Sequence, residues 1–123
     1  MVGVMVVDDQ SPFRRAARAV INATEGFEAV GDAESGLEAL HHADQLHPDV
    51  VLIDVHMPEM DGFETSRRLT ESHPECVVVL VSLDALELPD SAVTACGAVA
   101  FLRKQELRPA TLRSLWSVHG ARG

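Results

Sequence analysis

Acidic residues directly follow two of the short apolar runs in this sequence. Asp8 and Asp9 follow the first run, Asp54 closes a later one, and Ser82 and Lys104 follow two others. Carboxylate oxygens are hard ligands that suit Mg²⁺, which usually keeps an open side for water and phosphate oxygens. A hydroxyl can hydrogen-bond a phosphoryl oxygen, and an ammonium can neutralise it. If these side chains meet, they form a site for phosphate chemistry.

Lys104 is the only lysine among the ten lysine and arginine residues of the chain. A compact ammonium covers one phosphate oxygen without the planar fork of a guanidinium. Taken singly, each candidate has an ordinary interpretation: Asp forms turns and caps, Ser bonds nearby backbone, and Lys is usually on the surface. Their joint placement after separate apolar runs is what predicts a site.

The apolar runs are too short for helices and rich in valine, which predicts buried strands. The predicted strands cover residues 2–7, 27–30, 50–53, 77–81 and 98–102. Because the strands alternate with helical segments and are apolar throughout, we expect an α/β fold whose parallel sheet carries helices on both faces. Ligands of such sheets bind beyond the carboxyl ends of the strands, where the candidate residues stand.

Helix signals lie between these runs. Ser11 is the expected N-cap of the first helix, with Pro12 in its first turn, and Ser35 with Glu38 forms a capping-box pattern. The other expected helices cover residues 63–72, 89–97 and the segment from 109 onward. The apolar stripe expected for the second helix comprises Leu37, Leu40, Ala43 and Leu46, and the last helix carries Leu112, Leu115 and Trp116.

The chain has 123 residues, enough for one domain, and is 46% hydrophobic and 24% charged, as globular domains are. A net charge of -9 argues against this chain binding nucleic acid or an anionic membrane surface. No apolar stretch is long enough to span a membrane, and the N-terminus does not resemble a signal peptide. Cys76 and Cys96 are expected to be buried free thiols, so a cytoplasmic location is predicted.

Four segments together resemble the receiver domain of two-component response regulators, the CheY-like superfamily. The segments are Val6-Val7-Asp8-Asp9, then Leu52 to Gly62 with Asp54 and the Met57-Pro58 pair, then Val81-Ser82, and last Phe101-Leu102-Arg103-Lys104. The resemblance implies a flavodoxin-like, doubly wound, five-stranded parallel sheet, (βα)5, with strand order 2-1-3-4-5. It assigns residues 1–119 to the receiver domain and leaves 120–123 as a C-terminal tail.

The resemblance implies that Asp54 accepts a phosphoryl group. Asp8, Asp9 and Asp54 would hold Mg²⁺, with the backbone carbonyl of His56 as a further ligand. Such chemistry depends on positioning and on cancelling charge at the transferring group. The domain would catalyse only its own phosphorylation and dephosphorylation, so it is not expected to be an enzyme acting on other molecules.

The same resemblance implies a switch. Ser82 and Lys104 would contact the phosphoryl oxygens, and Phe101 would move inward with Ser82. This movement would reshape the face made by the fourth helix, fifth strand and fifth helix, through which a homodimer is a family expectation. The implied partner is a sensor histidine kinase, in a phosphorelay.

The sequence departs from the family pattern near the predicted site. Gln105 follows the lysine where most relatives have proline, the residue that lowers the cost of a cis peptide, so the sequence leaves the Lys104–Gln105 peptide open between cis and trans. Leu83 is bulky where the family usually has a small residue, and it is expected to narrow access to Asp54. His56 and Asp84 stand where the family tunes loss of the phosphoryl group.

Other functions stay open at this point. A haloacid-dehalogenase-type hydrolase would have two acids separated by one residue, whereas Asp8 and Asp9 are adjacent. A flavodoxin-like binding module would have a Ser/Thr/Gly-rich loop in place of residues 10–12. A degenerate receiver acting through protein contact alone is a further alternative. The sequence stops soon after the last expected helix, so we expect a stand-alone receiver or a piece of a longer regulator, in which DNA would be contacted through an output domain.

Overall fold

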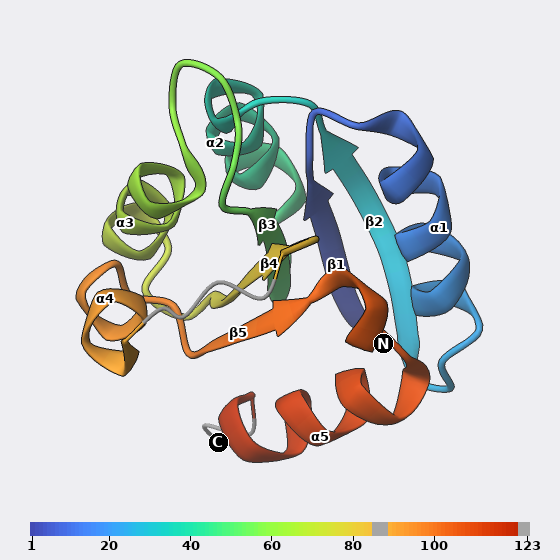
Figure 1. Cartoon of the computed structure of the whole chain (residues 1–123). Coiled ribbons are helices and arrows are strands. Elements are labelled where there is room, and N and C mark those ends of the chain that lie inside the picture. Colours follow the sequence, from blue (N-terminus) through green and yellow to red (C-terminus); the bar gives the residue numbers. More distant parts are fainter. Residues whose placement is uncertain (85–88, 121–123) are drawn as a thin grey trace.

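Five parallel strands form one sheet in the order β2-β1-β3-β4-β5 (Figure 1). The computed structural model describes residues 1–84 and 89–120. The strands are β1 (Val2–Val7), β2 (Phe27–Ala33), β3 (Val50–Asp54), β4 (Val77–Ser82) and β5 (Ala100–Arg103). The helices are α1 (Ser11–Asn22), α2 (Gly36–Leu46), α3 (Gly62–Ser72), α4 (Asp90–Ala95) and α5 (Pro109–His119), and a short 3-10 helix, η1 (Lys104–Glu106), precedes α5. The predicted flavodoxin-like α/β fold and its strand order are confirmed.

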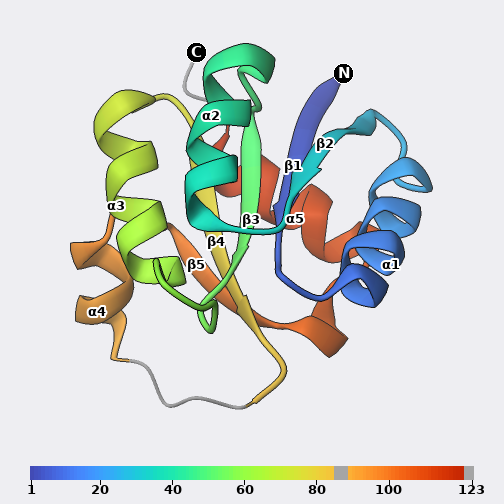
Figure 2. The same cartoon turned by 90° about the horizontal axis from the view of Figure 1, so that it is seen from above.

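The sheet separates two layers of helices, with α1 and α5 on one face and α2, α3 and α4 on the other (Figure 2). Alternate residues of the central strands point into the two layers: Val4 and Val6 belong to the core beside α1 and α5, and Met5 and Val7 to the opposite core. Both sheet faces are therefore apolar, which explains why the strands read as continuous valine-rich runs.

The first helix begins one residue earlier than predicted. Gln10, not Ser11, is the N-cap residue of α1, and its side chain makes no capping hydrogen bond. The Gln10 N–H donates to Asp8 Oδ1 at 2.7 Å, so the chain turns immediately after the acidic pair. Ser35 does cap α2 as predicted, since its Oγ accepts a hydrogen bond from the Glu38 N–H at 3.2 Å.

The predicted apolar stripe of α2 is wrong in part. Leu37 and Leu46 are 60% and 39% exposed, whereas Gly36, Ala39 and Ala43 are buried. The packing is close: a Cβ atom on Gly36 would lie 2.4 Å from Thr65 Oγ1 of α3. Small residues therefore form the buried face of this helix because α3 leaves no room for leucine.

Three element boundaries also differ from the sequence prediction. Strand β2 extends to Ala33 instead of ending at residue 30, and β5 covers Ala100–Arg103 instead of 98–102. Helix α4 is shorter than the predicted 89–97, and Gly97 then turns the chain with φ 83°.

An irregularity interrupts the pairing of β1 with β2. Val4 pairs with Ala29 but Met5 pairs with Gly31, so Val30 is an extra residue on the edge strand.

Among the described residues, no helix is long and apolar enough to cross a membrane.

Candidate functional site

The carboxyl ends of four strands bring the predicted site residues to one pocket. Asp8 follows β1, Asp54 ends β3, Ser82 ends β4 and Lys104 follows β5. The parallel register aligns these ends, because Asp54 pairs with Val81 and Ser82 with Arg103. The pocket is lined by Asp9, Gln10, Asp54, His56, Ser82, Leu83, Asp84 and Lys104.

Three carboxylates meet within this pocket. One oxygen from each of Asp8, Asp9 and Asp54 lies within 4.8 Å of the other two. Asp8 is 0% and Asp54 5% exposed, so their charges are largely removed from water. Because like charges at this distance repel, a cation is needed to stabilise the ionised cluster.

Lys104 supplies one such cation. Its Nζ lies 2.5 Å from Asp8 Oδ2 and 3.1 Å from Asp54 Oδ2. Burial acts to lower the pKa of this ammonium, but the carboxylates of Asp8 and Asp54 outweigh that effect and raise the pKa above its usual range. The side chain therefore stays charged beside the acids.

Asp8 remains incompletely compensated. Burial raises the pKa of its carboxyl group, while Lys104 and the Gln10 N–H lower it and the Asp54 charge raises it again; the net shift is upward. Its Oδ2 is buried and has no hydrogen bond of regular geometry to a described residue, although the Lys104 ammonium lies beside it. An under-satisfied buried oxygen among three convergent carboxylates is a donor set that fits a hard divalent cation.

Asp54 is held by a backbone N–H at one carboxylate oxygen and by a side-chain ammonium at the other. Its Oδ1 accepts a hydrogen bond from the His56 N–H at 2.9 Å, and its Oδ2 faces Lys104. Gly62 packs against the strand end, where a Cβ atom would lie 2.4 Å from the Asp54 carbonyl oxygen. The glycine thus allows the start of α3 to approach the acidic residue, and the Gly62 N–H donates to the Val55 carbonyl at 3.1 Å.

Ser82 lies at the same edge but is not bonded to the acids. It is buried, and its Oγ accepts a hydrogen bond from the Asp84 N–H at 3.2 Å. The next residue, Leu83, is 64% exposed at the pocket. Gln105 donates from Nε2 to the Leu83 carbonyl at 3.4 Å, and the Lys104–Gln105 peptide, which the sequence left open, is trans.

Phe101 lies away from the acidic pocket. It is half-buried on β5, packs against the core beside α2, α3 and α4, and lines a separate hollow with Val93 and Thr94 of α4. Ser82 is the pocket residue on the neighbouring strand β4, and Leu80 of that strand pairs with Phe101. The two predicted switch residues are therefore on adjacent strands.

Two residues of α1 contact the site and were not predicted to do so. The Lys104 Nζ lies over the Phe13 ring, 4.4 Å from its centroid. Arg14 donates from Nη1 to the Asp8 carbonyl at 2.7 Å and from Nε to Asp32 Oδ2 at 3.2 Å. Phe13 carried only a helical-spacing signal in the sequence, and Arg14 carried none.

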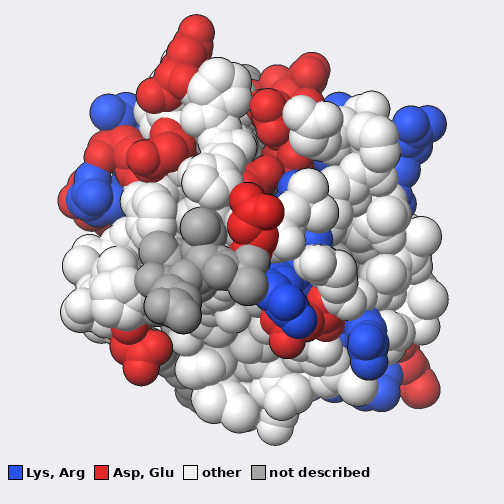
Figure 3. All heavy atoms as spheres, viewed as in Figure 1, with Lys and Arg blue, Asp and Glu red and all other residues white. Residues whose placement is uncertain are grey.

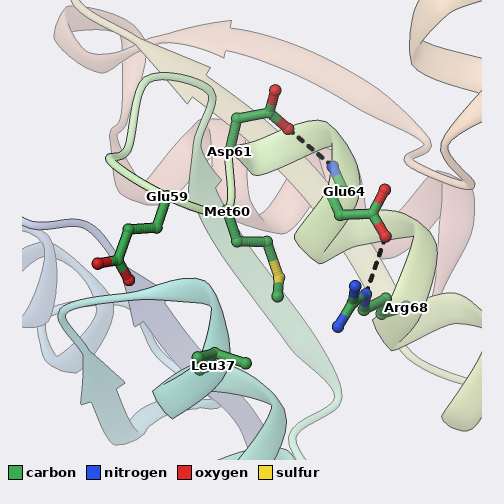
Figure 4. Close-up of a pocket in the computed structure, with 6 residues that line it drawn as sticks. All are labelled: Leu37, Glu59, Met60, Asp61, Glu64 and Arg68. Carbon is green, nitrogen blue, oxygen red and sulfur yellow. Dashed lines mark hydrogen bonds and ion pairs between the residues drawn. The ribbon is translucent and has the colours of Figure 1, made fainter.

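Another hollow lies between the loop after β3 and the helices α2 and α3 (Figure 4). Three of its charged residues are linked by hydrogen bonds: Asp61 Oδ1 accepts from the Glu64 backbone N–H at 2.9 Å, and Glu64 Oε2 from Arg68 Nε at 2.8 Å. The Arg68 hydrogen bond holds the pKa of the Glu64 carboxyl below its usual range. These groups cap and stabilise α3, so this hollow offers no comparable cluster of uncompensated groups.

Acidic side chains are prominent on the face seen in Figure 3, with basic ones scattered among them. This appearance agrees with the net charge of -9. The face therefore has no continuous basic stripe of the kind that tracks a nucleic-acid backbone.

The fold and the acidic pocket define a class of protein that sequence comparison also finds. Residues 4–115 match the family described as the response regulator receiver domain. The chain belongs to this family.

Individual relatives agree. The response regulator GacA of Pseudomonas viridiflava is 38% identical over 104 residues, covering 85% of this chain and 49% of GacA. A protein-glutamate methylesterase/protein-glutamine glutaminase of Geobacter metallireducens is 38% identical over 108 residues, covering 85% of this chain and 31% of that protein. The chain thus spans about half or less of the length of these relatives.

Solved structures show the same architecture. The signal receiver domain of the putative response regulator NarL from Mycobacterium tuberculosis superposes with a TM-score of 0.84 at 28% identity, covering 98% of both chains. The response regulator domain of Thermotoga maritima CheB gives 0.85 at 25% identity, covering 100% of this chain and 99% of that one.

Proposed function

We propose that this chain is a phosphorylation switch in which Asp54 accepts a phosphoryl group from a sensor histidine kinase. The observation that carries the proposal is the convergence of Asp54, two further carboxylates and the Lys104 ammonium in one pocket at the carboxyl edge of the sheet. An Asp54 oxygen would attack phosphorus, and the bond from phosphorus to the donor nitrogen would break as the new phosphorus–oxygen bond forms.

Different residues of this chain have different roles in the phosphoryl transfer. The His56 N–H fixes one Asp54 oxygen, leaving the carboxylate oriented into the pocket. Lys104 neutralises charge on the incoming phosphoryl oxygens, and Ser82 offers a hydroxyl to one of them. Ser82 has donor capacity for this, since its Oγ only accepts from Asp84.

We propose that Asp8, Asp9 and Asp54, with the backbone carbonyl of His56, hold Mg²⁺. When bound, the ion would stabilise negative charge on the phosphoryl group during transfer. The Asp8 Oδ2 atom supports this assignment, because it is buried, has no hydrogen bond of regular geometry to a described residue, and shares the Lys104 ammonium with Asp54.

The experiment is intact-mass measurement after incubation with acetyl phosphate. Wild type with Mg²⁺ is expected to gain one phosphoryl group, and EDTA or Asp54→Ala is expected to prevent the gain. Asp44→Ala is the matched control, because Asp44 is an exposed aspartate of α2 outside the pocket. A phosphoryl group that persists in Asp54→Ala contradicts the assignment, and no adduct together with no Mg²⁺ binding favours a receiver that acts by contact alone.

We further propose that the signal passes through Ser82 and Phe101 to the α4–β5–α5 face. The hollow beside Phe101, lined by residues of α4 and β5, supports this, because an inward movement of the ring would change its shape. Phosphorylated and unphosphorylated chain should then differ in self-association through this face, measured by sedimentation. Equal association of both forms contradicts a dimerisation switch.

His56, Leu83 and Asp84 are proposed to set the lifetime of the phosphoryl group, because all three line the pocket. Replacing Leu83, which is largely exposed, by alanine should open the pocket to water and shorten that lifetime. Asp84→Ala should change it through the water that attacks phosphorus. Phosphate release followed over time measures both, and an unchanged lifetime in Asp84→Ala excludes a role for that carboxylate.

A further inference from the structure

The ammonium of Lys104 touches two kinds of surface. On one side lie the carboxylates of Asp8 and Asp54, and within 4.4 Å of Nζ is the centroid of the Phe13 ring. Phe13 comes from the start of α1, is half-buried, and packs against the core beside α1 and α5. The ring is therefore anchored by the core and presents a face to the charge.

An aromatic face attracts a cation through its quadrupole without neutralising it. A carboxylate competes with an incoming phosphoryl oxygen for the ammonium, whereas a ring leaves the charge available. The lysine stem is also long and flexible, so a fixed contact reduces the positions that its ammonium samples. The lysine side chain is 6% exposed, which strengthens such an interaction relative to one in open water.

We propose that Phe13 is a positioning residue whose ring holds the Lys104 ammonium at the acidic pocket for the transferred phosphoryl group. The inference rests on the proposed phosphorylation of Asp54. An aliphatic residue could fill the same space in the core, but it would offer the ammonium no attractive face. Phe13 therefore acts through Lys104 and does not itself touch the reacting atoms.

The test compares Phe13→Leu and Phe13→Met, which remove the ring, with Phe13→Tyr, which keeps it. Phe27→Leu is the matched control: Phe27 is buried in the same core cluster, at the beginning of β2 and at the opposite end of the sheet from the pocket. Thermal unfolding of each variant shows which of them are folded, and Phe13→Met replaces Phe13→Leu if the latter is not.

The first readout is the NMR shift of the lysine side chain. Because Lys104 is the only lysine, ¹³C-lysine labelling gives a single set of side-chain signals. Stacking over the ring should shift the terminal methylene protons upfield in wild type and Phe13→Tyr. The shift should disappear in the aliphatic variants and persist in Phe27→Leu.

The second readout is the initial rate of phosphoryl uptake from acetyl phosphate at saturating Mg²⁺. Loss of the ring should slow uptake on the order of fivefold, with Phe13→Tyr and Phe27→Leu close to wild type. Uptake by folded Phe13→Leu or Phe13→Met at the wild-type rate overturns the inference, as does a wild-type lysine shift that the aliphatic variants retain. If wild type takes up no phosphoryl group and binds no Mg²⁺, the proposed function fails, and the inference about transfer fails with it even where the lysine shift is as expected.

Discussion

At the residue scale, the burial of Asp8 carries an electrostatic cost. Its carboxyl group is fully buried, its pKa is raised by burial, and one ammonium must serve both Asp8 and Asp54. A carboxylate with a raised pKa in the folded state destabilises that state when ionised. Perturbed pKa values of this kind cluster at functional sites, which agrees with the proposed role of Asp8 in holding a cation.

Asp8→Asn should therefore stabilise the metal-free protein at pH 7, by about 1 kcal/mol. The amide has the same shape as the Asp8 carboxylate, and its oxygen can still accept a hydrogen bond from the Gln10 N–H. The substitution removes one of the three negative charges that lie close together in the site. The same change should weaken Mg²⁺ binding. Urea unfolding with EDTA and with Mg²⁺ measures both effects, and a less stable metal-free variant would contradict the account of Asp8.

The buried thiol of Cys76 makes the stability of the folded state depend on pH. Burial raises the pKa of its thiol to about 12, from 9.0. The folded state thus keeps the proton that the unfolded state loses, so this group makes stability fall as pH rises from about 9 toward 12. At pH 8, thiol reagents should modify Cys76 only in urea, as peptide mapping would show; rapid modification of the native protein would be inconsistent with its burial.

At the scale of elements, the sequence predicted strands better than helix faces. Strands β1, β3 and β4 were found close to their predicted bounds because both sheet faces are covered and apolar side chains fill nearly every position. Helix α2 was misread because its buried face is built from Gly36, Ala39 and Ala43. Hydrophobicity alone favours leucine, whereas close contact with α3 requires small residues.

Gly62 couples the beginning of α3 to the end of β3. A Cβ atom would lie 2.4 Å from the Asp54 carbonyl oxygen and 2.7 Å from Val55 Cα, both backbone atoms that cannot rotate away. Gly62→Ala should destabilise the protein by about 1–3 kcal/mol and reduce phosphoryl uptake by displacing Asp54. Thermal unfolding and intact mass test this, and a variant as stable and as active as wild type would refute it.

Ser35, the N-cap residue of α2, should contribute to the stability of the folded domain. Removing its hydroxyl in Ser35→Ala leaves the Glu38 N–H without that partner, at a cost of about 1 kcal/mol. Ser72→Ala, at the last residue of α3, is the control and should change stability little. Equal free energies of unfolding for the two variants, measured in urea, would show that the cap does not matter.

At the scale of the whole molecule, the strand-end rule was enough to assemble the acidic pocket. Asp8, Asp9, Asp54 and Lys104 come together because parallel strands all end at one edge. Phe13 and Arg14 were missed because their contacts depend on how α1 sits against that edge. Sequence spacing within one helix carries no information about such long-range packing.

Mg²⁺ should stabilise the entire domain if it binds the folded state alone. At a concentration 100 times its dissociation constant, the gain is about 2.7 kcal/mol. A rising thermal midpoint with added MgCl₂, reversed by EDTA and reduced in Asp8→Asn, is the expected result. A midpoint insensitive to Mg²⁺ in wild type would argue against a divalent cation site.

The extra residue in β2 decides which way an edge strand faces. Phe27 and Ala33 are six positions apart and would share a face in a regular strand, yet they lie in opposite cores. The insertion at Val30 thereby turns Asp32 toward α1, where it pairs with Arg14, whose guanidinium also holds the Asp8 carbonyl. Regular pairing of β2 with Val30 kept in the ladder would aim Asp32 at the opposite layer of helices, so the alignment of the acidic pocket is set in part by an irregularity at the far margin of the sheet.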